Sequence, residues 1–400
     1  MTPVQDSARV HIVGAGPVGL LLTALLQPTP GLSIRLYEKR SDYTRTRMVR
    51  LAPWLVADSV ESYRVDHIDG ESVEAIFDPS ELDLGLTVRQ SIPTDLSALL
   101  REWTLGFCPL NVIEHSLSEL IDNRRSGNVE RISGAMTSDA ALQVLAPGDI
   151  MTDCTGARSL LRDQLVPPGE TNTLNLRLEY SIVVTFLYAK PYVCNEFCKY
   201  YKNMDNAEYK FIPAVDRVCY DGEITHVTGI VNITEADYEK MPPTFNGAWL
   251  REHFPGVARS MDRFIDKVKQ ESHGEVIGDL EIVRIPLNLY RARNATNRKL
   301  LANGADDHPL ATSPVFLVGD SAIGSPYFQS ISLGFECAMS LAGLLTRKDL
   351  PLREKLDQYE LYIYKQWLRV YMRSKMIKHN KDLFECVDDP FALLERLHLY

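Results

Sequence analysis

Three glycines near the start of the chain have the spacing that a nucleotide phosphate requires. Gly14, Gly16 and Gly19 form the pattern G-x-G-x-x-G. In this pattern the first glycine permits a tight turn, the second lets the backbone approach a pyrophosphate, and the third lets a helix lie close to a sheet. The N-terminus of that helix offers free N–H groups and a partial positive charge to the phosphates. The spacing therefore predicts a dinucleotide site.

The segments around these glycines fit the prediction. Residues 10–13 form a short, mostly apolar run that is typical of a strand, and the leucines over residues 20–26 suit a buried helix. A second strand is expected over residues 33–37. It ends at Glu38, about twenty residues after the last glycine, where a carboxylate that binds a ribose hydroxyl belongs.

A strongly basic loop follows Glu38, over residues 39–50. It is either a solvated surface, or it contributes one or two arginines that pin the phosphates of the nucleotide. Guanidinium groups suit the second role because they make bidentate contacts with phosphate. Arg45 or Arg47 would take that role, and both interpretations stay open.

A second glycine turn lies in the middle of the chain. A strand expected over residues 149–153 leads into Thr155 and Gly156, and Ser159 and Arg162 fall on the first turns of the following helix. By itself this pattern indicates only a turn followed by a helix.

A third glycine turn lies near the C-terminal end. A buried strand expected over residues 314–318 is followed by Gly319 and Asp320. The next helix, expected over residues 333–345, carries small residues that permit close packing.

Other elements are expected from hydrophobic periodicity and turn residues. Helices are expected over residues 51–60 and 92–100, the latter with Thr94 or Asp95 as its N-cap. Residues 71–90 and 111–115 suggest strands, and residues 129–132 and 141–145 suggest a small hairpin.

Between residues 171 and 294 the chain is rich in β-branched and aromatic residues, which indicates a β-rich domain inserted into the first. Its strands are expected over residues 181–188, 225–233 and 280–290, the last as an edge or bulged strand because of Pro286. Helices are expected over residues 249–254 and 260–270. Its candidate proton-transfer residues, each more readily explained as structural, are Tyr209, Tyr220 and His226.

Composition excludes several classes of protein. The chain has 400 residues, a net charge of −10 and an ordinary globular balance of 45% hydrophobic and 24% charged residues. The negative charge argues against non-specific nucleic-acid binding. No apolar run has the length of a membrane span, and the N-terminus lacks the apolar region of a signal peptide. Seven scattered cysteines fit a reducing, cytoplasmic location, and Cys194 and Cys198 are interpreted as structural because no second pair completes a zinc site. The basic patch of the helical tail, interpreted as a solvated face, comprises Arg369, Arg373, Lys375, Lys378 and Lys381.

Together, the three glycine motifs resemble in type and order those of the FAD-dependent monooxygenases of the aromatic-hydroxylase type. The resemblance covers most of residues 10–345. Residues 38–53 also resemble the corresponding stretch of the MICAL actin-oxidising monooxygenases, a local likeness that transfers no substrate. The resemblance implies an α/β fold, with a Rossmann-like FAD-binding domain, an inserted β-sheet substrate domain and C-terminal helices. The FAD-binding domain would comprise residues 1–75, 91–170 and 300–345, the substrate domain residues 76–90 and 171–299, and the helical segment residues 346–400.

The resemblance also assigns roles to residues. The early glycines would contact the ADP pyrophosphate, and Glu38 would contact the adenosine ribose. Arg45 or Arg47 would occupy the place of the arginine that the family has after the second strand. Asp320 would accept a hydrogen bond from the ribityl chain. The residues implied to bind FAD are Gly14, Gly16, Pro17, Val18, Gly19, Glu38, Lys39, Arg45, Arg47, Thr155, Gly156, Gly319, Asp320 and Ser332. No catalytic residue is assigned.

The chain departs from the family's pattern at four places. Thr155-Gly156 stands where the family has Asp-Gly, and Ala322-Ile323 stands where it has Ala-His. The family's arginine near residue 96 corresponds to Pro93 unless Arg89 supplies it. Two glycines of the flavin loop correspond to Ser330 and Ser332, which makes this loop less permissive.

The function implied is that of an FAD-dependent monooxygenase, which uses NADH or NADPH and O2 to oxidise a small, cyclic or aromatic metabolite. In such enzymes the flavin carries the redox chemistry. The altered flavin loop leaves open an oxidase, a reductase or a rearrangement catalyst. A halogenase is disfavoured because the chain lacks a W-x-W-x-I-P signature. A non-catalytic flavin-binding redox protein is a further alternative, and the oligomeric state is left open.

Overall fold

The structure, a computed structural model, describes residues 8–45, 48–49, 51–52, 55–56, 92–105, 108–124, 126–166, 173–189, 209, 211–218, 224–303, 309–325 and 330–385. The chain divides into two compact units. The first unit comprises Met1–Arg45, Val49–Leu176 and Leu289–Tyr371, and the second comprises Thr46–Met48, Arg177–Asn288 and Met372–Tyr400.

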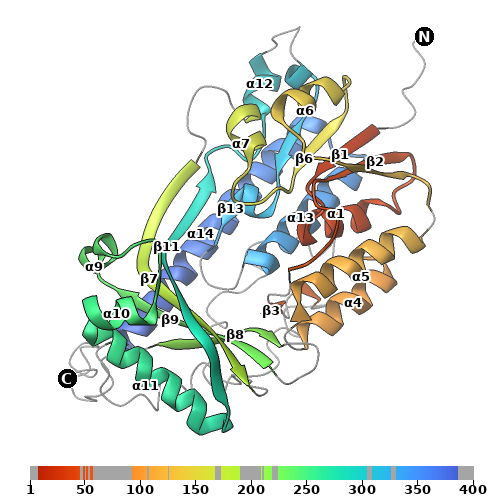
Figure 1. The fold of residues 1–400 in the computed structure, drawn as a ribbon. Coiled ribbons are helices and arrows are strands. Elements are labelled where there is room, and N and C mark those ends of the chain that lie inside the picture. The colour runs from red at the N-terminus through yellow and green to blue at the C-terminus, as the bar shows by residue number, and fades with distance from the viewer. Residues whose placement is uncertain are drawn as a thin grey trace, which may run out of the picture. The chain divides into compact units, whose positions relative to one another are not determined.

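The first unit is built on a five-stranded parallel sheet (Figure 1). Along the sheet the strands have the order β12-β6-β1-β2-β5. Val13 pairs with Tyr37 on one side and with Asp153 on the other, so the carboxyl ends of the central strands meet at one edge. The strands are β1 (Ala8–Val13), β2 (Leu32–Glu38), β5 (Val129–Ser133), β6 (Ile150–Asp153) and β12 (Val315–Leu317).

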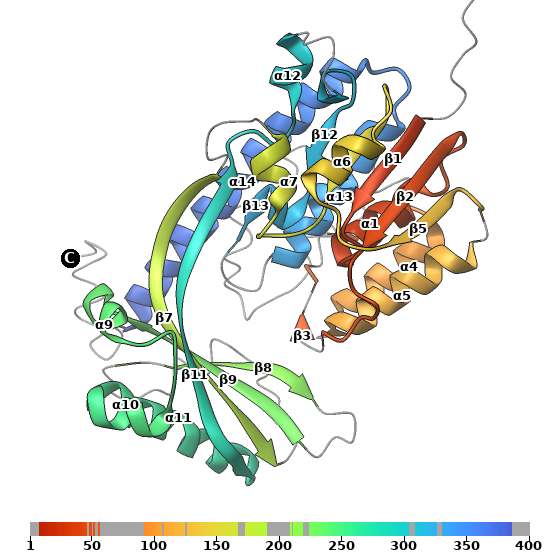
Figure 2. The same ribbon diagram turned by 45° about the horizontal axis from the view of Figure 1, so that its top comes forward.

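Helices cover this sheet, and its central strand β1 is buried over residues 10–13. Val10 and Ile12 of β1 are fully buried, and so are Leu20, Leu21 and Leu22 of the following helix. Helix α1 lies beside α13 and α5, and Figure 2 shows the three helices grouped near β1 and β2. The helices of this unit are α1 (Pro17–Leu26), α4 (Thr94–Thr104), α5 (Leu110–Asn123), α6 (Ser138–Val144), α7 (Leu160–Leu165), α12 (Arg298–Asn303) and α13 (Ser330–Thr346).

Short elements complete this unit. Two 3₁₀ turns flank β12, at Pro309–Ala311 and Gly319–Ser321. Strand β13 (Ile323–Gly324) follows the second turn, and β3 (Met48–Val49) and β4 (Cys108–Pro109) form a two-stranded sheet.

The second unit is an antiparallel sheet with helices. Its strand order is β10-β11-β7-β9-β8, and ten residues of β9 pair with β7, from Ile224↔Ala189 to Ile233↔Tyr180. The ring of Phe264 on α11 packs so closely on Gly229 of β9 that a Cβ there would lie 2.6 Å away. The elements are β7 (Thr173–Ala189), β8 (Ile212–Val218), β9 (Ile224–Ile233), α9 (Glu235–Lys240), β10 (Thr244–Asn246), α10 (Gly247–His253), α11 (Pro255–Ser272) and β11 (Glu275–Ala292).

The long C-terminal helix α14 (Leu352–Glu385) joins the core of the first unit through its N-terminal half. The Tyr359 hydroxyl donates to the carbonyl oxygen of Leu317 at 2.8 Å, and its ring meets that of Phe316 edge-on at 5.5 Å. No helix in the described part of the chain is long and apolar enough to cross a membrane.

The predicted fold class is confirmed: the chain combines a parallel α/β unit, a β-rich segment and a C-terminal helix. Strand β11 as a whole lies between β10 and β7, but β10 pairs with Glu281–Val283, so Pro286 lies beyond that pairing. The helix predicted over residues 333–345 begins earlier, at Ser330. The helix over 51–60 and the strands over 71–90 lie almost wholly outside the described residues.

Three local predictions are wrong. Residues 111–115 belong to helix α5, because Ile113, Leu117 and Ile121 form a buried stripe at helical spacing. The hairpin over 129–145 is instead β5, which joins the parallel sheet beside β2, followed by helix α6. The N-cap of helix α4 is Pro93, and Thr94 and Asp95 lie within the first turn of the helix.

Candidate dinucleotide site

Four turns of the first unit lie next to one another at the carboxyl edge of the parallel sheet. Gly319 follows β12, the turn at Thr155 follows β6, the glycine loop follows β1, and Arg40 follows β2. The chain passes from β1 to β2 on one side, while β6 lies on the other side of β1. Such a switch point is where open α/β sheets bind their ligands.

The three early glycines are required for different reasons. Gly14 has φ +97°, and a Cβ on it would lie 2.8 Å from the carbonyl oxygen of Cys154. A Cβ on Gly19 would overlap the carbonyl oxygen of Gly14. A Cβ on Gly16 would meet only an ordinary contact, 3.5 Å from Nη2 of Arg45. Packing therefore explains Gly14 and Gly19, whereas Gly16 leaves backbone open to a ligand.

The N-terminus of α1 is also open. Gly16 is its N-cap and supplies no capping side chain, and Pro17, which has no N–H, occupies the first turn. The Val18 side chain packs closely against Gly319 and Gly334. A Cβ on Gly334 would lie 2.5 Å from Val18 Cγ2, and one on Gly319 would lie 3.3 Å from Val18 Cγ1. This packing joins α1 to the third motif and to the start of α13.

Asp153, rather than Thr155, organises the second motif. The fully buried Asp153 carboxylate accepts hydrogen bonds from the Thr155 N–H at 2.9 Å, from its hydroxyl at 2.6 Å, and from the Ser159 hydroxyl. Burial raises the pKa of Asp153, and the hydrogen bonds from Ser159 and Thr155 oppose that rise. Gly156 follows with φ +89°. Thr155 itself is exposed at this edge.

The second and third motifs are bonded to each other. The Val318 N–H donates to the Asp153 carbonyl oxygen at 2.9 Å. The buried Arg162 donates to the carbonyl oxygens of Ala157 at 3.2 Å and Ser321 at 3.5 Å. The Tyr290 hydroxyl donates to the carbonyl oxygen of Asp320 at 2.5 Å. These bonds fix the Gly319-Asp320 turn beside the turn after β6.

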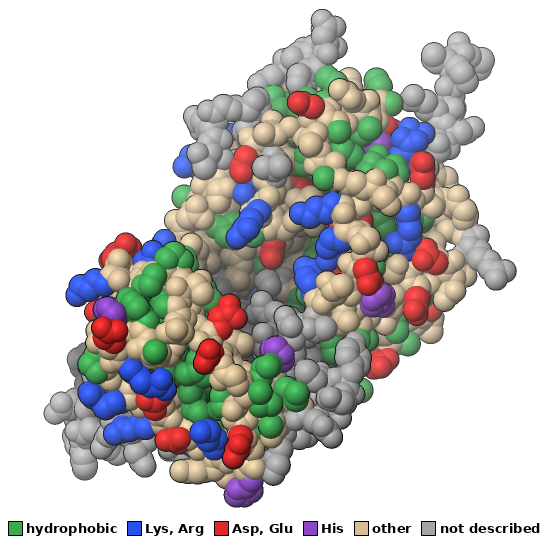
Figure 3. All heavy atoms as spheres, in the orientation of Figure 1, with side chains coloured by type: hydrophobic (Ala, Val, Ile, Leu, Met, Phe, Trp, Pro, Cys, Tyr) green, Lys and Arg blue, Asp and Glu red, His purple; other side chains and the backbone are tan. Residues whose placement is uncertain are grey.

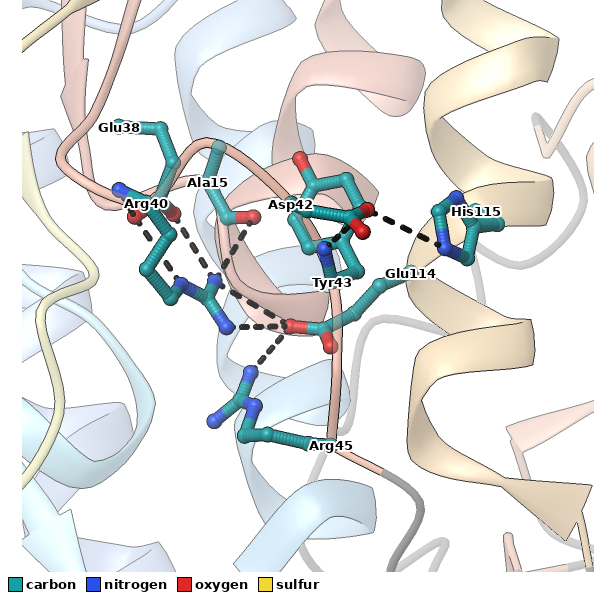
Figure 4. Close-up of polar contacts among 8 residues, drawn as sticks. All are labelled: Ala15, Glu38, Arg40, Asp42, Tyr43, Arg45, Glu114 and His115. Carbon is teal, nitrogen blue, oxygen red and sulfur yellow. Dashed lines mark hydrogen bonds and ion pairs between the residues drawn. The ribbon is translucent and has the colours of Figure 1, made fainter.

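A cluster of charged side chains lies near Gly16. Figure 4 shows the side chains of Arg40 and Arg45 directed toward the Glu114 carboxylate. Arg40 donates to both carboxylate oxygens of Glu38, at 2.9–3.1 Å, and from two nitrogens to Oε1 of Glu114, at 3.3 Å each. Nη2 of Arg45 donates to the same oxygen of Glu114. Burial alone would raise the pKa of Glu38, but the hydrogen bonds and charge of Arg40 outweigh it and lower that pKa. Glu38 is thus an ionised carboxylate whose main partner is Arg40.

Glu114 is the site residue that sequence reasoning missed. It lies on α5, its side chain is fully buried, and its Oε2 atom has no hydrogen-bond partner among the described residues. The Arg45 carbonyl oxygen accepts from Asn111 N–H at 2.8 Å, which anchors the basic loop at the start of this helix. A glutamate on the apolar stripe with Ile113 and Leu117 was the available signal, hidden by the assignment of a strand.

The other predicted residues are placed as follows. Lys39 is exposed. Ser332 is buried, and its hydroxyl accepts a hydrogen bond from Ala52 N–H at 3.0 Å. Tyr209 and His226 belong to the second unit, not to the motifs of the first. Arg47, Arg89, Tyr220, Cys194 and Cys198 lie outside the described residues.

Arg369 corrects the prediction of a solvated basic face on the tail helix. Its side chain is 13% exposed and forms an ion pair with Glu336 of α13, which is 3% exposed. Lys375 is exposed. Elsewhere, acidic and basic side chains of the described residues are interspersed on the face drawn in Figure 3. In the described part of the chain no cluster of His, Cys, Asp and Glu side chains is arranged to hold a metal ion.

The residues present fit the diphosphate and ribose of a dinucleotide. The backbone of Gly16 is open, the N-terminus of α1 is uncapped, and the Arg45 guanidinium, on a side chain that is 47% exposed, lies within reach of both. Arg45 uses one nitrogen on Glu114, which leaves other N–H donors for a phosphate.

Comparison with known proteins finds no matching family model and no matching curated protein. Among solved structures, the tetrameric form of 2-methyl-3-hydroxypyridine-5-carboxylic acid oxygenase is 14% identical with a TM-score of 0.49, over 98% of this chain and 96% of that one. The Diels-Alderase PyrE3 of pyrroindomycin biosynthesis is 14% identical with a TM-score of 0.49, over 98% and 79%. The tetracycline destructase Tet(51) is 12% identical with a TM-score of 0.47, over 98% and 94%. At this identity and TM-score, none of these proteins transfers a function to the chain.

Proposed function

We propose that the first unit binds FAD and that the protein is an FAD-dependent oxidoreductase. In its most specific form, the proposal is a monooxygenase that inserts one oxygen atom of O2 into a small, cyclic or aromatic metabolite, with NADH or NADPH as reductant. One observation carries it: three glycine turns and an acid–arginine pair stand in a row at the carboxyl edge of one parallel sheet, and Gly16 is left open there.

Different residues of the chain would bind different parts of the cofactor. Gly14, Gly16 and Gly19, with the N-terminus of α1, would receive the diphosphate, since helix N-termini attract anions. Glu38 would accept a hydrogen bond from a ribose hydroxyl on the capacity that Arg40 leaves free. The turns at Thr155-Gly156 and Gly319-Asp320 would flank the ribityl chain. Bound FAD would supply the redox chemistry.

The second unit is proposed to hold the substrate. Its sheet and helix α11 enclose an apolar core that includes Phe186, Phe211 and Phe264, which gives it a framework of its own. The small-molecule substrate and O2 are the proposed partners, and a cytoplasmic location stays a prediction from cysteine usage.

The first experiment asks whether the protein binds FAD. The purified protein is titrated with FAD, and the absorption spectrum and flavin fluorescence are followed. The proposal predicts a saturable spectral shift at one FAD per chain. A protein that holds no flavin and gives no shift with added FAD contradicts it.

The second experiment identifies the reaction. Oxidation of NADH and NADPH is followed with candidate cyclic and aromatic metabolites, and products are analysed after incubation in labelled oxygen. Label in the product supports oxygen insertion. Turnover without label identifies an oxidase, a reductase or a rearrangement catalyst, and tight FAD binding with no reduction by either nucleotide identifies a non-catalytic flavin protein.

A further inference from the structure

Glu114 places a negative charge where a diphosphate site would be expected to carry only positive ones. Its carboxylate comes from α5 and is fully buried, and its Oε1 atom lies 4.0 Å from where a Cβ on Gly16 would be. The nearest atom to that point is Nη2 of Arg45, at 3.5 Å, and this nitrogen donates to Glu114. Glu114 is therefore paired with the guanidinium that lies nearest to the place where an anionic ligand would approach the glycine loop.

The charges around Gly16 cancel. Two guanidinium groups, those of Arg40 and Arg45, face two carboxylates, those of Glu38 and Glu114. A diphosphate that enters this cluster adds negative charge next to a buried carboxylate, and like charges at short range in a partly buried site repel each other strongly. The cluster therefore has no net positive charge to attract the ligand unless one arginine separates from its carboxylate partner.

Arg45 is the arginine that can leave. Arg40 is held by both oxygens of Glu38 and donates to the carbonyl oxygen of Ala15 at 3.5 Å, and its side chain is 28% exposed. Arg45 contacts Glu114 through one nitrogen, and its side chain is 47% exposed. A half-exposed guanidinium can turn toward a ligand without losing its packing in the core.

The arrangement of Glu114 is poor for stability, which points to a role in binding. All three N–H contacts from Arg40 and Arg45 fall on its Oε1 atom, and its buried Oε2 atom has no hydrogen-bond partner among the described residues. A buried carboxylate oxygen without a donor costs free energy.

We propose that Glu114 competes with the dinucleotide diphosphate for Arg45 and thereby sets the affinity for the cofactor. The inference rests on the proposed function, in that FAD is the dinucleotide. In the free protein Glu114 neutralises Arg45, and on binding the phosphate takes over this guanidinium. The protein consequently binds its dinucleotide more weakly than it would without the Glu114 carboxylate.

The test is a titration of FAD, and separately of ADP, into the wild type and Glu114→Gln, followed by fluorescence and calorimetry. The variant keeps the size of the side chain and removes its charge. We expect it to bind both ligands about tenfold more tightly. Glu119→Gln is the matched control, because Glu119 is an exposed acid on the same helix, and its dissociation constants are expected within about twofold of the wild type.

Arg45→Gln separates competition from general charge repulsion. In this background the substitution Glu114→Gln is expected to change the FAD dissociation constant by less than about threefold, because the contested guanidinium is gone. An equal tightening in both backgrounds overturns the inference, and so does a Glu114→Gln protein that binds FAD as the wild type does or more weakly while its thermal unfolding midpoint is unchanged. Failure of the wild type to bind FAD overturns the proposed function and this inference with it, whereas FAD binding by the wild type without the Glu114 effect overturns the inference alone.

Discussion

The hydroxyl group of Ser321 donates a hydrogen bond to the carbonyl oxygen of Asp153, 2.5 Å away and 168 residues earlier in the chain. The same hydroxyl accepts from the Val318 N–H at 2.8 Å. One buried side chain thus joins the turn after β6 to the turn after β12. The two turns that would flank the ribityl chain hold each other in place.

Removal of this hydroxyl should affect both stability and ligand binding. We expect Ser321→Ala to lower the free energy of unfolding by about 1–2 kcal/mol, because buried polar groups lose a partner. FAD affinity should fall as the two turns loosen. Urea unfolding and FAD titration measure the two effects. Ser133→Ala, at an exposed serine of β5, is the control, and equal behaviour of the two variants contradicts the account.

The buried ion pair of Glu336 with Arg369 should be costly to break from one side. Arg369→Met removes a guanidinium from the Glu336 carboxylate, which is 3% exposed, so we expect a loss of about 3–5 kcal/mol in the free energy of unfolding. The exposed pair of Arg347 with Asp349 offers the comparison, and Arg347→Met should cost less than about 1 kcal/mol. The free energies of unfolding are measured with denaturant. Equal losses in the two variants would contradict the prediction that the buried pair contributes more than the exposed one.

Acid should destabilise the first unit through His11. This histidine is fully buried on β1, and its ring nitrogens contact the Tyr37 hydroxyl at 2.9 Å and Asp149 at 3.1 Å. Burial lowers the pKa of His11, and the hydrogen bond to Asp149 opposes this only in part. A histidine with a lowered pKa in the folded state contributes stability that is complete above about pH 6.5 and is lost as the pH falls.

The measurement is urea unfolding of the wild type and His11→Gln between about pH 7.5 and 5.5, a range that spans the ordinary pKa of histidine. The wild type should lose more stability across this range than the variant. A wild-type slope in His11→Gln would assign the acid sensitivity to other groups.

Gly19 should be needed for the fold itself. A Cβ at this position overlaps the carbonyl oxygen of Gly14 and lies 3.3 Å from the Cys154 side chain, so α1 would have to move off the sheet. We expect Gly19→Ala to lower the free energy of unfolding by at least about 2 kcal/mol. The companion variant is Gly16→Ala, because the Cβ added there meets only ordinary contacts.

The glycine motifs made the parallel unit predictable from the sequence. Each combines an apolar run with a glycine whose positive φ or close contact has a physical cause, as at Gly14 and Gly319. Where the sequence failed, tertiary context decided. The β-branched residues Val112 and Ile113 favour a strand locally, but the spacing of Ile113, Leu117 and Ile121 lets α5 bury a stripe against its neighbours.

The charged part of the site was less predictable. Arg45 is a candidate because it follows the second strand, but its partner Glu114 lies 69 residues later, on a helix for which the local sequence predicts a strand. Long-range ion pairs have no periodic signature in a sequence. Asp153 illustrates a second limit: its carboxylate accepts hydrogen bonds from Thr155, and the sequence pattern does not single it out.

Binding of FAD by the wild type and by Gly16→Ala tests the central claim most directly. The wild type should bind one FAD per chain. Gly16→Ala should unfold at the same temperature as the wild type and bind FAD about a hundredfold more weakly, because the methyl group occupies the place where the diphosphate approaches the backbone. Equal FAD affinity of the two proteins, or a folded wild type that binds no FAD, would contradict the account.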